Sequence, residues 1–90
     1  MLKGAITHLK KQKARINIGA EDGILLGSKY VVIASETIQP PHQSGSLIKL
    51  DNGQFVELKI TKVEENFSEA NIFPRKGQTL IQEGDLIYAR

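Results

Sequence analysis

Histidine and cysteine are the side chains that most often bind metal ions, and this sequence has few of them. Its 90 residues include no cysteine and two histidines, His8 and His42, which lie far apart. A zinc or iron site needs three or four ligands held close together. The lack of cysteine also excludes disulfides and thiolate chemistry. We therefore expect no metal site and no bound cofactor.

A serine nucleophile is the next chemistry to consider. Ser44 or Ser46 could be combined on paper with His42 and Asp51 into a Ser-His-Asp triad. No sequence typical of a strained nucleophile turn surrounds either serine, because both lie beside Gly45 in a polar segment. We do not expect catalysis at these residues.

Paired carboxylates could serve as a general acid and a general base, and four glutamates lie close in sequence: Glu57, Glu64, Glu65 and Glu69. Such a pair must be held at a set separation across a pocket, with burial raising the pKa of one group. A polar turn at Glu64-Glu65 offers the opposite environment. These residues indicate a solvated end of the domain, and the sequence as a whole predicts a protein that is not an enzyme.

Glycine recurs at every fourth position in one segment, as Gly19, Gly23 and Gly27. The spacing matches neither phosphate-binding glycine pattern, and Glu21 and Asp22 would repel a phosphate. Glycine also permits positive φ in tight connections. We expect a structural connection here, with Ile24 and Leu26 packed under the domain.

Positive charge is concentrated at the N-terminal end. The first fifteen residues carry a net charge of +5 and the rest carries −3; the basic residues are Lys3, Lys10, Lys11, Lys13 and Arg15. This asymmetry could attract nucleic acid or an acidic membrane surface. Alternatively, the lysines keep a hairpin turn soluble and block edge pairing.

Aromatic residues are few: Tyr30, Phe55, Phe67, Phe73 and Tyr88. Barrels that bind single-stranded nucleic acid stack bases on exposed aromatics interleaved with basic residues. Tyr30 beside Lys29 and Tyr88 near Arg90 are the pairs of this kind. We expect the aromatic residues to lie in the core or at its rim.

Strands are the elements expected to position these residues. Apolar and polar residues alternate over residues 14–18, 56–60 and 68–72, which is typical of half-buried strands. The apolar positions shift by one residue before Val63, which predicts a bulge at Thr61-Lys62. A turn at residues 64–66 joins the last two strands into a hairpin, and Pro74 ends the second because it lacks a backbone donor.

Further strands are predicted at residues 29–34, 46–50 and 86–90, with the second leading into an Asp51-Asn52-Gly53 turn. Residues 4–9 are also predicted as a strand, although the spacing of Leu2, Ala5, Ile6 and Leu9 fits a helical stripe. One short helical turn is expected at residues 21–26.

Residues 1–90 therefore form one all-β domain: a small, mostly antiparallel barrel of six to seven strands, similar in size to an SH3 domain, with at most one short helical turn. A sandwich is the alternative. An irregular loop at residues 35–45 contains Pro40-Pro41, which cannot join a central ladder. The apolar stretches are too short to span a membrane, and residues 1–15 do not resemble a signal peptide.

Two segments carry a resemblance to a known family. Residues 16–30, INIGAEDGILLGSKY, resemble a glycine-rich segment of small β domains from bacterial envelope proteins, and residues 60–87 resemble their closing pattern, which ends in Gly84-Asp85. From Gly4 onward the sequence resembles the C-terminal domain of flagellar assembly protein T, and more loosely rod-shape-determining protein MreC. This sequence departs from the family pattern at two places. Ser28 stands where the family has Asp, and the Pro40-Pro41 pair of the 35–45 loop has no match in the family pattern.

The resemblance implies a barrel without cofactor or reaction that serves a scaffold around the flagellar basal body. Our leading hypothesis is a noncatalytic protein–protein interaction module of that bacterial envelope assembly. The partner would dock on the 35–45 loop at Pro40, Pro41, His42 and Gln43, since loops on a rigid scaffold often carry binding. The alternative is a small β-barrel protein that binds nucleic acid through its basic N-terminal hairpin. The chain would be periplasmic if it is a domain excised from a longer protein of this family, and cytoplasmic otherwise.

Overall fold

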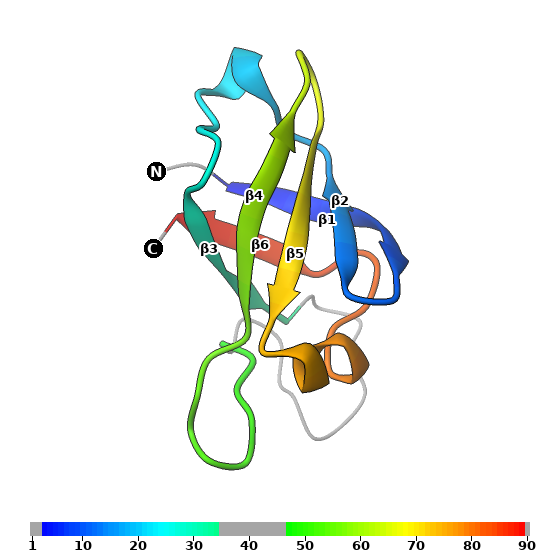
Figure 1. Ribbon diagram of the computed structural model, residues 1–90, viewed down its shortest axis with the longest axis vertical. Helices are drawn as coiled ribbons and strands as arrows, with labels where there is room; N and C mark the ends of the chain where they lie inside the picture. Colours follow the sequence, from blue (N-terminus) through cyan, green and yellow to red (C-terminus); the bar gives the residue numbers. More distant parts are fainter. Residues whose placement is uncertain (1–2, 35–46, 90) are drawn as a thin grey trace.

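Six strands close into one barrel in the computed structural model, which describes residues 3–34 and 47–89 (Figure 1). The strands are β1 (Lys3–Lys10), β2 (Lys13–Ile16), β3 (Lys29–Ile33), β4 (Glu57–Val63), β5 (Ser68–Phe73) and β6 (Leu86–Ala89). Their order around the barrel is β1-β2-β5-β4-β3-β6, and all neighbours are antiparallel. The predicted all-β barrel is confirmed.

The connections between the strands produce a Greek key. Strands β3, β4 and β5 follow one another as a meander, and β6 returns to lie beside β3. Closure comes from pairing between the two ends of the chain, where Lys3 is opposite Tyr88 and Ala5 is opposite Leu86. Each strand is thereby paired on both sides, which removes the open edges that invite aggregation.

The core is built mainly from β-branched residues at alternate strand positions. In β4, for example, Leu58 and Ile60 are buried while Lys59 between them is exposed. β-branched side chains pack well on a pleated sheet, which explains their abundance here. The buried apolar residues are Ile6, Ala14, Ile16, Ile18, Ile24, Tyr30, Val32, Ala34, Ile48, Val56, Leu58, Ile60, Ala70, Ile72, Ile81 and Ile87.

Two strands contain irregularities that shift the inward positions by one residue. The pairing of β4 with β5 shifts between Ile60 and Lys62, which confirms the predicted bulge. The pairing of β1 with β2 shifts between Ile6 and His8. Because of this shift, Ile6 and Leu9 both contact the core although they are three residues apart. The predicted strand at residues 4–9 is therefore confirmed, and the helical alternative is wrong.

The strand predicted at residues 46–50 is not found in the described segment from Leu47 onward. Two isolated bridges occur instead, between Ile33 and Leu47 and between Lys49 and Phe55. The amide of Ile48 donates to the Val32 carbonyl (3.0 Å), while the Ile48 carbonyl accepts from Val56 (3.0 Å). Buried Ile48 thus bridges two separate partners and does not extend a ladder with either.

The short helical segments also differ from the prediction. The turn expected at residues 21–26 is a 3-10 turn, η1 (Ala20–Asp22), and the chain leaves it at Gly23 with φ of 87°. A second 3-10 turn, η2 (Arg75–Thr79), was not expected. It lies against the barrel: Gly77 is buried and an added Cβ would be 2.9 Å from a methyl carbon of Val56. The described residues thus contain two such turns, where at most one was predicted.

Neither 3-10 turn is long and apolar enough to cross a membrane, and the described ranges contain no longer helix. The predicted irregular loop at residues 35–45 falls outside the part of the chain that the structure describes.

Candidate functional site

The predicted partner-binding residues cannot be placed on the barrel. Pro40, Pro41, His42 and Gln43 all lie outside residues 3–34 and 47–89. Docking on this loop therefore stays a prediction. Two other surfaces, one apolar with acidic neighbours and one basic, are fully described.

The apolar surface consists of two adjacent leucines in the connection between η1 and β3. The side chains of Leu25 and Leu26 are 70% and 69% exposed, whereas neighbouring Ile24 is 4% exposed. The prediction that Ile24 packs under the barrel is confirmed, and the same prediction for Leu26 is wrong. We call Leu25 and Leu26 the leucine pair.

Hydrogen bonds on both sides fix the backbone that carries the leucine pair. The Gly27 amide donates to the Ile60 carbonyl of β4 (2.9 Å), and the Ile60 amide donates to the Ser28 carbonyl (2.9 Å). The Ser28 hydroxyl and amide both donate to the Leu25 carbonyl, at 2.5 and 3.2 Å. Gly27 has φ of 83°, a conformation that glycine adopts at little cost. The two leucines are thus exposed on a specific turn that hydrogen bonds hold against β4.

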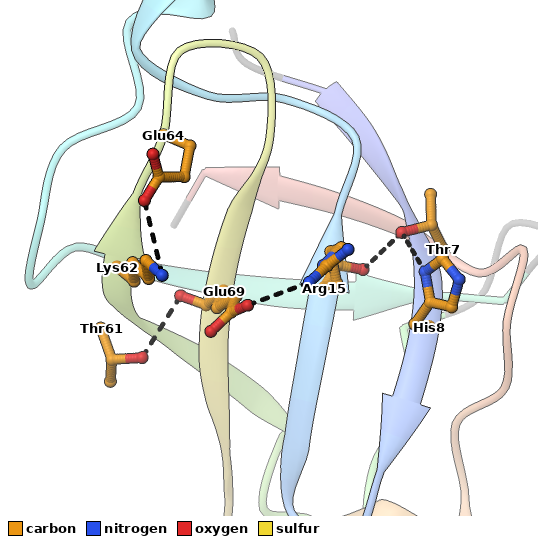
Figure 2. Close-up of polar contacts among 7 residues, drawn as sticks. All are labelled: Thr7, His8, Arg15, Thr61, Lys62, Glu64 and Glu69. Carbon is orange, nitrogen blue, oxygen red and sulfur yellow. Dashed lines mark hydrogen bonds and ion pairs between the residues drawn. The ribbon is translucent and has the colours of Figure 1, made fainter.

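Acidic residues lie at the same end of the barrel. Turn η1 packs against the β4–β5 turn, where the Ala20 amide donates to the Glu64 carbonyl (2.8 Å) and the Glu21 amide to the Glu65 carbonyl (3.0 Å) (Figure 1). We call the carboxylates of these two turns the acidic rim: Glu21, Asp22, Glu64 and Glu65. Lys62 pairs with Glu64 at 3.6 Å, on the side of the rim nearest the sheet (Figure 2).

Four of the five residues of the predicted basic patch gather on the β1–β2 hairpin. Lys10, Lys11, Lys13 and Arg15 are exposed there, with Lys11 in the turn at φ of 55°. The fifth, Lys3, begins β1 and lies about 23 Å along the strand from Lys10. Sequence proximity thus overstated the patch, because an extended strand separates its ends.

Contacts across the sheet hold Arg15 in place. Its guanidinium pairs with Glu69 at 3.3 Å and lies over the Phe67 ring, 4.7 Å from the centroid. The backbone carbonyl of Arg15 accepts from the Thr7 hydroxyl (3.2 Å), and the His8 ring contacts the same hydroxyl (3.2 Å) (Figure 2). Arg15 is therefore a neutralised, structurally engaged cation.

A hollow of about 400 Å³ lies along this hairpin, lined by His8, Leu9, Lys10, Lys13, Ala14, Arg15 and Glu69. The lining combines an apolar floor with positive charge at the rim, since Leu9 and Ala14 pack on the core. Within the described ranges, no three histidine or carboxylate side chains come close enough to hold a metal ion. The hollow suits an anionic or mixed apolar and anionic group.

Among the described residues, two polar side chains are fully buried, and both make structural contacts. Asp85 is 1% exposed and accepts a hydrogen bond from the Gln82 amide (2.9 Å) in the turn before β6. The Ser68 hydroxyl is also buried and donates to the Ile18 carbonyl (2.7 Å). Both hold strand ends onto the barrel.

Comparison with known proteins adds no relative: no family model matches this sequence, and no curated protein is significantly similar to it.

Sequence reasoning missed surface residues whose neighbours are set by strand pairing. Lys29, Lys59 and Phe73 lie far apart in the sequence, yet they line one hollow of about 200 Å³ together with Glu57. Phe73 is 44% exposed, which fits a place at the rim and not in the core. Alternation indicates that Lys59 and Phe73 face outward, but only the pairing of β4 with β3 and β5 brings the three together.

Proposed function

We propose that this domain is a noncatalytic protein–protein interaction module and that it docks through the leucine pair. The observation that carries the proposal is the 70% and 69% exposure of Leu25 and Leu26 on a hydrogen-bonded turn. Burying a leucine side chain contributes about 1.5 to 3 kcal/mol. Two neighbouring leucines on a rigid support can therefore supply the central contact of an interface.

The acidic rim defines the chemistry of the partner. Charges around an apolar contact select partners of opposite sign and speed their encounter. A pocket that accepts two leucines and is bordered by lysine or arginine complements this end of the barrel. The mechanism is rigid docking, because the turn carrying the leucine pair is already fixed by the bonds to Ile60.

The assembly we propose for this module is a bacterial envelope complex, in particular the scaffold around the flagellar basal body, with the domain in the periplasm. The support for this part is the resemblance of residues 16–30 and 60–87 to the C-terminal domain of flagellar assembly protein T. A second contact through Pro40, Pro41, His42 and Gln43 belongs to the same proposal.

Site-specific crosslinking tests the docking surface. A photoreactive amino acid in place of Leu26 is expected to capture one defined envelope protein in living cells, while the same group in place of exposed Lys49 does not. Affinity for that purified partner is then expected to fall about tenfold or more in Leu25→Ser/Leu26→Ser.

Leu47→Ser is the matched control, because Leu47 is 39% exposed and belongs to another segment. Circular dichroism checks that each variant folds. Equal affinity of the wild type and the double variant, or equal loss in Leu47→Ser, would rule out docking through the leucine pair.

A further inference from the structure

The outer face of the barrel carries a row of lysines that the sequence does not display as a cluster. Strand pairing places Lys10 opposite Lys13, Lys13 opposite Asn71, Asn71 opposite Lys59, and Lys59 opposite Lys29. These residues, which we call the lysine row, come from five adjacent strands, β1, β2, β5, β4 and β3. At about 4.8 Å per strand the row is about 19 Å long.

The lysine row contains like charges in direct opposition. Lys10 faces Lys13 and Lys29 faces Lys59, an arrangement that destabilises a sheet. All four are exposed, and no ion pair joins any of them to a described residue. The fold thus tolerates repulsion that a bound anion would relieve.

The neighbouring row on the same face shows the usual arrangement. Arg15 is opposite Glu69, which in turn is opposite Lys62, so positive and negative charges alternate across β2, β5 and β4 (Figure 2). The Arg15–Glu69 ion pair is formed, at 3.3 Å. In the lysine row no carboxylate stands directly opposite a lysine; the nearest carboxylates, Glu57 and Glu69, line the hollows at its two ends.

An exposed aromatic ring lies beside the lysine row. Phe73 is 44% exposed, is two residues beyond Asn71 on β5, and lines the 200 Å³ hollow with Lys29, Lys59 and Glu57, the residue opposite it on β4. Exposed lysines contact phosphates, and an open aromatic ring stacks on a base.

We propose that the lysine row and Phe73 bind single-stranded nucleic acid. The four lysines contact successive phosphates across the barrel, and a base stacks on Phe73. The exposed ring favours a single strand over a duplex, whose bases are already stacked. This inference does not rest on the proposed docking function, because it uses other residues.

The dependence of binding on salt measures the phosphate contacts. Fluorescence anisotropy with a labelled oligothymidylate of about 12 nucleotides is expected to show binding that weakens steeply between about 20 and 200 mM KCl. Four contacts give a slope of about −3 in the logarithm of affinity against the logarithm of salt concentration. Lys13→Gln and Lys59→Gln should each make the slope shallower by about 0.7.

The matched control for the lysines is Lys49→Gln, since Lys49 is also exposed but contacts the Phe55 ring in a segment away from the row. Its slope should equal that of the wild type. Phe73→Ser should weaken oligonucleotide binding about 5- to 150-fold with no change of slope. Inorganic polyphosphate, which has no bases, should bind Phe73→Ser and wild type equally.

Each other outcome rejects the proposal. Absence of oligonucleotide binding at about 20 mM KCl would rule out the proposal. A change of slope in Lys49→Gln equal to that in Lys13→Gln and Lys59→Gln would show only nonspecific charge attraction. Unchanged oligonucleotide binding in Phe73→Ser would indicate a general polyanion surface. Leu25→Ser/Leu26→Ser should bind the oligonucleotide like the wild type, so that failure here is separate from failure of the docking proposal.

Discussion

Gly19 occupies a position at which a side chain has no room. Its φ is −146°, an extended conformation open to any residue, so its role is not the positive φ expected from the glycine spacing. A Cβ atom there would meet the Glu64 carbonyl oxygen and would lie 2.7 and 2.8 Å from the Phe67 amide nitrogen and carbonyl oxygen. Glycine lets η1 approach the β4–β5 turn closely enough to hydrogen bond with it.

Gly19→Ala is predicted to lower the free energy of unfolding by about 2 to 3 kcal/mol, because the opposing atoms are backbone and cannot rotate away. Urea denaturation measures the change. Gly23→Ala is the control: open space surrounds Gly23, so only its φ of 87° is penalised, at about 1 to 2 kcal/mol. A Gly19→Ala cost no larger than the Gly23→Ala cost would contradict the crowding argument.

The turns that precede β3 and β6 contain the same local hydrogen bond, from a backbone amide to an aspartate three residues later. Asp22 accepts a hydrogen bond from the Gly19 amide (3.0 Å), and Asp85 accepts one from the Gln82 amide (2.9 Å). Each aspartate thus ties back the amide three residues earlier. The two sites differ in burial, because Asp22 is exposed and Asp85 is 1% exposed.

Asp85→Ala is predicted to destabilise the protein by about 2 to 3 kcal/mol, since it leaves a partly buried amide without its charged partner. Asp22→Ala, the matched variant, should cost about 1 kcal/mol, because it removes one hydrogen bond to the Gly19 amide but no buried side chain. Thermal and urea unfolding give both values. Equal losses in the two variants would show that burial does not set the strength of these turns.

Bulges limit how far a strand can be recognised from alternation. In β4 the shift between Ile60 and Lys62 follows a clear run of alternating residues, so the bulge could be predicted at Thr61-Lys62. In β1 the shift between Ile6 and His8 occurs in the middle of a short strand and gives Ile6 and Leu9 the three-residue spacing of a helix. The prediction of a strand at 46–50 was wrong for a different reason. Ile48 hydrogen bonds to Val32 on one side and to Val56 on the other, so no continuous ladder forms.

The whole molecule depends on pairing between its first and last strands. Strand β6 completes the barrel between β1 and β3 and contributes fully buried Ile87. Without β6, two strands would have open edges and the core would be exposed at one side. The closure is long-range in sequence although the paired strands are close in space.

Ending the chain after Asp85 is therefore predicted to abolish cooperative unfolding, as followed by circular dichroism in urea. A circular permutant that joins residue 90 to residue 1 through a short linker and begins at residue 81 retains every strand. It should still unfold cooperatively, because barrel closure needs the pairing and not the original chain order. Cooperative unfolding of the truncated chain would refute the importance of closure.

The sequence by itself determined the all-β class, the β4–β5 hairpin with its bulge, and the end of β5 at Pro74. These are local properties, set by alternation, turn chemistry and the missing donor of proline. Tertiary structure alone decided the exposure of Leu26, the separation of Lys3 from the other basic residues, and the lysine row. The reason is that strand register fixes which distant residues become neighbours, and register is settled by closing the whole barrel.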